Sequence, residues 1–290
     1  MTRLYDVPHG QIQQFERMLA EAGLNAEMVE AVLKNRDAAT GVVQFLRDLL
    51  TTNPFASELV SSNYAYPEGY APKDLAGQLA VLAKLYPDFD ISYVAAPRRL
   101  PEGAELFQLV PKLSSVARAN GIEDPYGTGY GRCLEIMLGH LNASRKFHNY
   151  REGRLGPDRL RLLPSTRKVL EKLEASVSGD FVVIPMQSGM LYRGSSARRS
   201  RWEIEHAESP EQWSLPAWVV GHHLLTHPER LSTGSELWLD CPGDEYFPDA
   251  DGQFEDALDF GFRGGTLSVD YGWADDASDG YGAASGFLPE

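Results

Sequence analysis

The run Phe181-Val-Val-Ile-Pro-Met186 is the clearest strand signal in the chain, and it constrains the fold more than any other feature. An apolar run without alternation predicts a strand that is buried on both faces. Helical patterns stand on either side of it, at Thr166–Val177 and Trp213–His227, and Glu236–Cys241 alternates as a strand does. A hairpin is expected around Arg263-Gly-Gly. We therefore expect the α+β class, with a helical N-terminal part and a C-terminal domain that holds a small sheet of about three to five strands.

The N-terminal part of the chain has a helical pattern. Asn25 is a plausible N-cap for a short helix, so residues 1–52 are interpreted as a small helical module. Residues 53–144 are mostly helical and are broken by prolines, and residues 145–290 form the expected α+β domain with an acidic C-terminal segment. The predicted break between the helical and the α+β parts lies near residue 145.

Two segments carry no regular pattern. Thr51–Pro72 has the composition of a linker, but Tyr64, Tyr66 and Tyr70 indicate a loop that is held against a folded surface. The closing segment Asp270–Glu290 is rich in Gly, Ala and Asp, which favours a tail or a surface cover.

Charge is strongly segregated along the chain. The 290 residues carry 27 Lys and Arg against 41 Asp and Glu, a formal net charge of −14. Residues 144–201 hold 13 basic and 5 acidic side chains, whereas residues 202–290 hold 2 basic and 19 acidic ones. Either the two segments face each other, within one chain or across an oligomer, or the basic segment holds an anionic ligand. An acidic protein with one basic segment is a poor general coat for nucleic acid.

The composition also bears on the compartment. No apolar run approaches the roughly 18 residues that a membrane span needs, so we expect no membrane partner. Cys133 and Cys241 are too few for a disulfide scaffold. These features predict a cytoplasmic protein.

The first candidate site is the basic segment. Guanidinium groups bind phosphate or carboxylate in a forked geometry, and backbone N–H groups at a helix start bind anions as well. A tyrosine among these bases could stack on a nucleotide base. The open alternative is that the arginines pair with the acidic residues downstream. The residues expected to bind the ligand are Arg145, Tyr150, Arg151, Arg193, Ser195, Arg198, Arg199 and Arg201.

The second candidate site is a cluster of histidine and aspartate. His223 and His227 are four residues apart and share one face of a helix, and Asp240 and Asp244 lie at the end of a strand. Imidazole and carboxylate together could hold a divalent metal. The alternative is structural, because histidines at a helix C-terminus are favoured by the helix dipole without any metal.

Five phrases together resemble an uncharacterised family of bacterial proteins from small-genome, uncultivated lineages. The resemblance implies a bacterial, non-secreted protein, but it carries no activity, cofactor or catalytic residue. The phrases are Ser144-Arg-Lys-Phe-His-Asn-Tyr, Tyr192-Arg-Gly-Ser-Ser, Leu224-Leu-Thr-His-Pro, Leu237-Trp-Leu-Asp-Cys and Ser285-Gly-Phe-Leu-Pro.

Three classes of function follow from these patterns. The leading hypothesis is a protein that binds a phosphate-bearing ligand, a nucleotide or a nucleic-acid segment, through the arginine-rich segment. The second is a metal-dependent hydrolase that uses the histidine and aspartate cluster. The third is a structural protein that self-associates into a homo-oligomer through its basic and acidic segments.

Overall fold

The computed structural model describes residues 52–91, 99–207, 211–248 and 254–288, together with parts of the range 17–44. The chain divides into two compact units, Met1–Asn53 and Pro54–Glu290. Of the predicted helical module 1–52, residues 1–16 and 45–51 lie outside the described part.

In the first unit, helix α2 begins directly after Asn25. The Asn25 side chain accepts a hydrogen bond from the backbone N–H of Met28 at 3.0 Å, which confirms the predicted N-cap. Helix α2 spans Ala26–Lys34. Leu33 on this helix is 80% exposed, so little of its apolar surface is buried within the unit.

The second unit holds the remaining elements. The predicted ranges 53–144 and 145–290 lie in it together, except for Asn53. The helices are α4 (Leu75–Leu85), α5 (Leu113–Ala119), α6 (Tyr130–Ser144), α7 (Pro164–Ala175), α8 (Ala197–Glu205), α9 (Ala217–Thr226) and the 3₁₀ turn η2 (Pro228–Arg230). The strands are β1 (Leu106–Pro111), β2 (Phe147–Asn149), β3 (Leu160–Leu162), β4 (Phe181–Arg193), β5 (Gln212–Ser214), β6 (Trp238–Tyr246), β7 (Asp256–Arg263), β8 (Thr266–Trp273) and β9 (Tyr281–Phe287).

These strands form one mixed sheet in the order β1-β4-β9-β6-β7-β8-β2, with β3 paired to β6 and β5 paired to β9. The α+β class is confirmed, but the predicted sheet of three to five strands was too small, since the described residues form nine. The sequence patterns did not predict four of the strands, because these are short or stand among prolines. They are β1, β2, β3 and β5. The buried strand at Phe181 is confirmed and continues to Arg193 as β4.

The closing segment of the chain is a central strand, which corrects its prediction as a tail. β9 lies between β4 and β6, antiparallel to the first and parallel to the second. Its small residues are buried on both faces, so the alternation that marks an edge or surface strand is absent. Gly282 is required there, because a Cβ would lie 2.2 Å from the carbonyl oxygen of Gly189.

The hairpin between β7 and β8 is confirmed. Gly264 and Gly265 both have positive φ, 57° and 76°, as a two-residue turn of this type demands. Arg263 pairs with Thr266, and the antiparallel register runs without interruption to the pair of Asp256 with Trp273.

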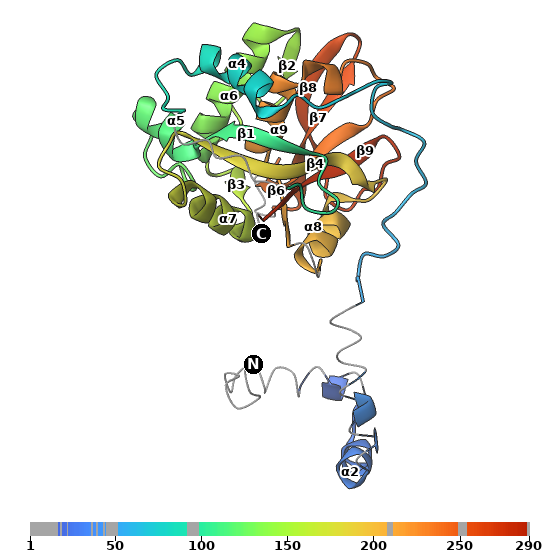
Figure 1. Cartoon of the computed structure of the whole chain (residues 1–290). Helices are drawn as coiled ribbons and strands as arrows, with labels where there is room; N and C mark the ends of the chain where they lie inside the picture. The colour runs from blue at the N-terminus through green and yellow to red at the C-terminus, as the bar shows by residue number, and fades with distance from the viewer. Residues whose placement is uncertain are drawn as a thin grey trace. The chain divides into compact units, whose positions relative to one another are not determined.

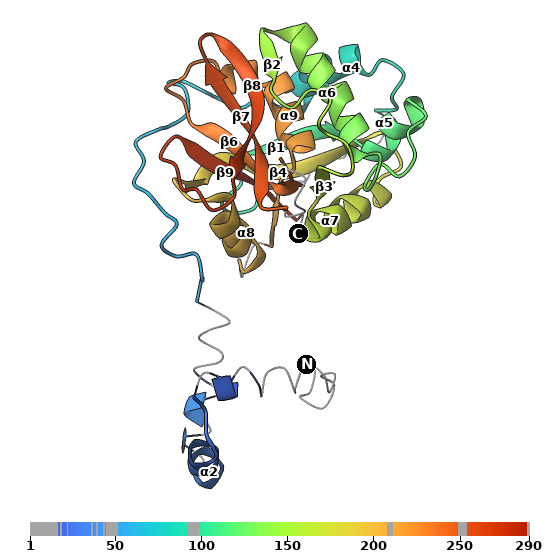
Figure 2. The ribbon, with the colours of Figure 1, turned by 180° about the vertical axis from the view of Figure 1, so that it is seen from behind.

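Helices cover one face of the sheet. α4, α6, α7 and α9 pack on that face, and their apolar side chains form a single core with those of the strands. Figure 1 shows these helices together around β1 and β4, and Figure 2 shows β7, β8 and β9 from behind with no helix in front of them. The other face of β6, β7 and β8 is therefore the open side of the sheet.

Helix α8 and residues 58–66, which we call the strap, cover part of that other face. The Ser196 side chain caps α8 by accepting from the backbone N–H of Arg199 at 3.1 Å. The strap pairs with the body at two isolated bridges, one of them between Leu59 and Ser195. Tyr66 of the strap donates a hydrogen bond to Glu105 at 2.6 Å.

The fully buried Arg230 contacts the strap through Tyr66. Its guanidinium lies 4.1 Å from the centroid of the Tyr66 ring and donates to Ser188 and to the carbonyl of Leu237. The predicted loop of tyrosines is thus held on the folded surface.

In the part of the chain that the structure describes, no helix is long and apolar enough to cross a membrane.

Candidate functional site

Three aspartates lie side by side on the open face of the sheet. Asp240 of β6 stands directly opposite Asp259 of β7, and Asp259 stands directly opposite Asp270 of β8. Residues at opposite positions of antiparallel strands share a face, with Cβ atoms roughly 4.5–5.5 Å apart. Their neighbours Leu239 and Phe260 belong to the core, so the aspartates point to the open face. We call Asp240, Asp259 and Asp270 the carboxylate row.

Asp259, in the middle of the carboxylate row, is 4% exposed, whereas the side chain of Asp270 at its outer end is 37% exposed. Asp240 is half-buried. Neither Asp240 nor Asp259 makes a side-chain hydrogen bond or an ion pair with another described residue. A buried carboxylate without such a partner is unusual, because removing a charge from water is costly.

The environment changes the acidity of both carboxyl groups. Burial raises the pKa of Asp240 to about 7, although the guanidinium of Arg201 opposes the shift. Burial and the charges of Asp240 and Asp270 raise the pKa of Asp259 well above its usual range, against the opposing effect of Arg263 and Arg151. Burial therefore favours the neutral form of both carboxyl groups, and Asp240, with its pKa near 7, is close to half-ionised at neutral pH.

Aromatic rings flank the inner end of the carboxylate row. The rings of Trp238 and Tyr281 meet edge to face with centroids 5.1 Å apart. The Trp238 indole lies against Gly261, where a Cβ would come within 2.5 Å of the ring, and the Arg263 guanidinium lies 4.5 Å from the indole centroid. Burial and the nearby aspartates raise the pKa of the Tyr281 hydroxyl, so it stays protonated.

The outer end of the carboxylate row opens into a hollow of about 330 Å³ lined by Arg151, Asp270, Tyr271 and Trp273. The Nε atom of Arg151 lies 3.0 Å from a carboxylate oxygen of Asp270, but the angle does not make a hydrogen bond and Nε has no other partner among the described residues. The hollow therefore gives a ligand access to Asp270, the outermost aspartate of the row.

Asp244 shows what a carboxylate with a structural role looks like in this chain. It is fully buried, and one oxygen accepts from the Tyr130 hydroxyl at 2.6 Å while the other accepts from the backbone N–H of Ala217 at 2.6 Å. Asp244 thus caps the start of α9. Its pKa is also raised to about 7 by burial, so a raised pKa alone does not distinguish the two kinds of site.

The predicted metal site of His223, His227, Asp240 and Asp244 does not form. Asp244 lies at the start of α9 and His227 just after its end, so about ten residues of helix separate them. Asp240 points to the opposite face of the sheet. Among the described residues, no group of three or more His, Cys, Asp or Glu is arranged to hold a metal ion.

The two histidines instead belong to a buried hydrogen-bond network. His223 bonds the side chain of Gln108 through Nδ1 at 2.9 Å, and His227 Nε2 accepts from the backbone N–H of Lys73 at 2.8 Å. Burial lowers the pKa of both imidazoles, that of His227 to about 4, so both are neutral at pH 7.

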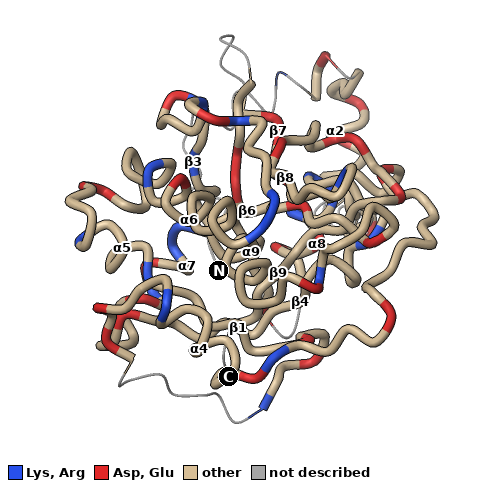
Figure 3. Tube along the Cα trace, turned by 90° about the horizontal axis from the view of Figure 1, so that it is seen from above, with Lys and Arg blue, Asp and Glu red and all other residues tan. Residues whose placement is uncertain are grey.

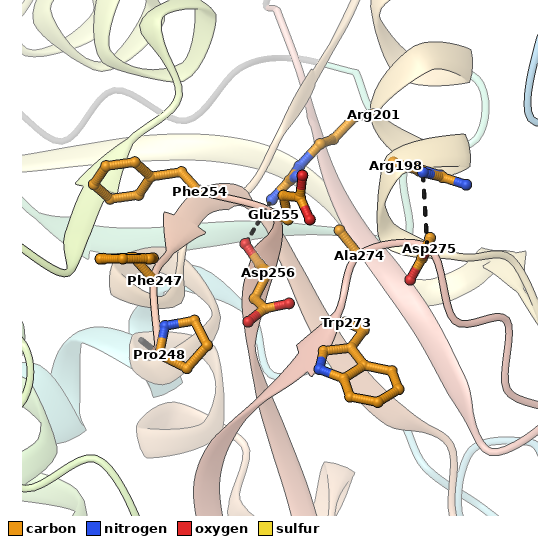
Figure 4. A pocket seen from close by; sticks show the side chains of 10 residues that line it. All are labelled: Arg198, Arg201, Phe247, Pro248, Phe254, Glu255, Asp256, Trp273, Ala274 and Asp275. Atoms are coloured by element: carbon orange, nitrogen blue, oxygen red, sulfur yellow. Dashed lines mark hydrogen bonds and ion pairs between the residues drawn. The ribbon is translucent and has the colours of Figure 1, made fainter. Parts of the chain in front are cut away.

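The arginines predicted on α8 are bound within the chain. Arg198 makes a two-pronged contact with Glu58 of the strap, and Arg199 pairs with Glu203 at 2.8 Å. Arg201 donates to the backbone carbonyls of Pro242, Asp244 and Asp256. Arg198 and Arg201 nevertheless line the same pocket, as Figure 4 shows.

The other predicted ligand residues lie apart from that pocket. Arg145 donates to the carbonyls of Pro228 and Leu231, and Arg193 donates to the carbonyl of Tyr64. Tyr150 is 51% exposed and packs on His148, next to the outer end of the carboxylate row. The Ser195 hydroxyl is buried without a partner among the described residues. The structure does not bring the eight residues together.

Several arginines of the basic segment pair with the acidic C-terminal segment inside one chain. Arg151 pairs with Asp270, and Arg161 with Glu245. In Figure 3, basic and acidic positions lie near one another in many parts of the view. Intrachain pairing therefore accounts for part of the charge segregation.

From the sequence, Asp240 was predicted as a metal ligand, and Asp259 and Asp270 were not predicted as site residues. A signal for these two was present. Asp259 lies four residues before Arg263, and Asp270 lies four residues after Thr266, so the hairpin turn places them opposite each other. The pairing of Asp240 with Asp259 has no such local signal.

No protein-family model matches the chain, and neither a curated protein nor a solved structure is similar to it. The resemblance to a bacterial family of unknown activity stays a prediction.

Proposed function

We propose that the protein is a hydrolase in which Asp240 and Asp259 act as a general acid–base pair on an uncharged or cationic substrate. The observation that carries the proposal is Asp259, a carboxyl group that is 4% exposed, lacks a hydrogen bond from the described residues and stands directly opposite a second aspartate.

The carboxylate row is costly for the fold. Like charges at opposite positions of a sheet are destabilising, and a buried carboxylate without a partner costs more still. Proteins break such local rules mainly at functional sites, where the arrangement serves the chemistry. Asp244 supports the contrast, because a structural carboxylate of this chain has a donor for each oxygen.

Acid–base hydrolysis requires an ionised Asp240 as the base and a protonated Asp259 as the acid, and the upward shift of the Asp259 pKa favours this assignment. In its ionised form Asp240 takes a proton from a water molecule, and the water oxygen forms a bond to the electrophilic carbon of the substrate. The bond from that carbon to the leaving group breaks as Asp259 donates its proton to the leaving group. Asp240 then returns its proton to Asp259 through solvent, and one water has been divided between two products.

The surroundings indicate the charge of the substrate. The Asp270 carboxylate and the ionised fraction of Asp240 repel phosphates and carboxylates, so an anionic substrate is disfavoured. The rings of Tyr150, Trp238 and Tyr281 beside the row suit the apolar face of a sugar or an amino-acid side chain. Glycosides are the first substrates to test, because one carboxyl group as acid and a second as base is the usual arrangement in glycosidases that activate a water directly. Peptides are the second, because aspartates that share a proton also cleave amides.

The test is hydrolysis of a panel of fluorogenic glycosides and of a peptide library by the full chain, Asp240→Asn, Asp259→Asn and Asp276→Asn. Asp276 is an exposed aspartate outside the row and serves as the matched control. We expect turnover of one panel, a loss of at least about 100-fold in either row variant and no change in the control. No turnover in either panel, or equal losses in all three variants, would overturn the proposal.

The phosphate-ligand hypothesis and the self-association hypothesis remain predictions. The geometry supports them less, since Arg198, Arg199 and Arg201 already have carboxylate or carbonyl partners in the chain. Binding of a nucleotide that is abolished by Arg198→Glu, or a mass that falls from oligomer to monomer at high salt, would restore one or the other.

A further inference from the structure

A second candidate binding site lies next to helix α8, away from the carboxylate row. It is a pocket of about 540 Å³ between α8, the end of β6, the start of β7 and the end of β8. Figure 4 shows Phe247, Pro248 and Phe254 on one side of it and Trp273, Asp275 and Arg198 on the other, with Glu255 and Asp256 between them. Its size is within the usual range of pockets for small ligands. The packed side chains of Ala197, Ala257 and Ala274 form a small cluster of their own at this end of the sheet.

The positive charges that line this pocket are already compensated. Arg198 donates through Nε and Nη2 to the Glu58 carboxylate, and its pKa is raised chiefly by that contact. Arg201 donates to three backbone carbonyls, 2.8 Å from that of Pro242 and 3.3 Å from that of Asp256. Neither guanidinium presents a free fork to an anion.

The negative charges are not compensated to the same degree. Glu255 is exposed and forms no hydrogen bond or ion pair with a described side chain. The Asp275 side chain is 57% exposed, and its one ion pair is the contact with Arg198 at 3.9 Å. With Glu58 balancing Arg198, the pocket presents an excess of carboxylate to an incoming ligand.

Trp273 indicates which kind of ligand this pocket favours. Its indole is 69% exposed at the mouth of the pocket, an unusual position for the largest apolar side chain. An indole face attracts an ammonium or guanidinium group, and the attraction grows when carboxylates stand close by. Trp273 also lines the hollow at the outer end of the carboxylate row, so it stands between the two openings.

We propose that the pocket next to α8 binds a small organic cation, an aliphatic amine whose ammonium group lies between the Trp273 indole and the carboxylates of Glu255 and Asp275. The apolar stem of the amine would lie along Phe247, Pro248 and Phe254. This site is independent of the proposed hydrolytic chemistry, since none of its residues belongs to the carboxylate row.

The test is titration calorimetry of the full chain with spermidine, with an uncharged glycol of the same length and with ATP. Glu255→Gln, Asp275→Asn and Trp273→Ala remove the proposed contacts one at a time. Asp276→Asn is the matched control, because Asp276 is an exposed neighbour of Asp275 that does not line the pocket.

We expect spermidine to bind, the glycol and ATP not to bind, and each of the three pocket variants to weaken binding at least about fivefold. The control should stay within about twofold of the parent, which also excludes a diffuse attraction to the acidic surface. No binding of spermidine, or an equal loss in Asp276→Asn, overturns the proposal. Binding of a lysine-rich peptide but not of the free amine also overturns it, in favour of a protein partner. A defect confined to Asp259→Asn would bear on the hydrolase proposal and not on this one.

Discussion

Helix α8 carries several arginines and the carboxylate row three aspartates, and the fold treats these two sets of charges in opposite ways. On α8, each arginine meets a carboxylate or a set of carbonyl oxygens of the same chain. In the row, Asp259 faces an aspartate on each neighbouring strand and has no hydrogen bond or ion pair with a described residue. A dense run of charge in a sequence therefore does not mark a binding site by itself. A charge that the fold leaves without a partner is the stronger sign.

Among the changes that test this comparison, we expect the largest effect on stability from a substitution of Arg201. Arg201→Met removes a buried guanidinium that joins α8 to the backbone around β6 and β7, and we expect a loss of about 3 kcal/mol in the free energy of unfolding. Urea denaturation measures it. Arg154→Met, an exposed arginine of the same segment, is the control and should change stability by less than about 0.5 kcal/mol. Equal stabilities for the two variants would mean that Arg201 is not structural.

Asp259→Asn should raise the free energy of unfolding, whereas Arg201→Met lowers it. The amide keeps the shape of the side chain and removes a buried carboxyl group that is held near other acids, so we expect a gain of about 1–2 kcal/mol at pH 8. The same variant should lose hydrolytic activity. A loss of stability at pH 8 would show that the Asp259 carboxylate has a favourable partner in the fold.

The pH dependence of stability sharpens the comparison further. The pKa of Asp240 is about 7 in the folded protein and about 4 in an unfolded chain, so the folded state binds more protons between these values. The contribution of Asp240 to stability is therefore full below about pH 4 and is lost as the pH rises through 7. Relative to Asp240→Asn, the parent should lose about 2 kcal/mol between pH 4 and 8, a value reduced because the side chain is half-buried. Parallel curves for the two proteins would contradict the raised pKa.

The smallest effect is expected at the contact between the strap and α8. Glu58→Gln removes the carboxylate that balances Arg198, a contact that is partly exposed, so we expect a loss of about 1 kcal/mol. The variant should also bind spermidine about twofold more weakly, since the pocket loses a negative charge. Tighter binding of spermidine by Glu58→Gln would contradict the inference that Glu58 balances the charge of Arg198 at the pocket.

Part of the candidate site could be predicted from the sequence. The Arg263-Gly-Gly turn predicts the hairpin, and once the turn is placed, Asp259 and Asp270 must pair because both are four residues from the ends of the loop. The arginines of α8 were also found as a cluster. Their role was misjudged, because the partner Glu58 lies 140 residues away in a segment that composition marks as a linker.

The position of β9 shows why the rest could not be predicted. Tyr281–Phe287 is made of small residues with no period, and a strand buried on both faces needs none. Its neighbours β4 and β6 are distant in sequence, so their pairing depends on how the helices pack against the sheet and not on any local preference. The same holds for Asp240 and Asp259, which are brought together by strand order.

The sequence alone determined the local elements of this protein, such as the Asn25 cap of α2, the buried strand at Phe181 and the hairpin at Gly264-Gly265. Each rests on steric limits and hydrogen bonds that act within a few residues. Only the tertiary structure decided which charges found partners. That outcome depends on the distances between segments far apart in the chain, where packing of the whole core sets the geometry. Arg201 was thereby given three carbonyl partners, and Asp259 was given none.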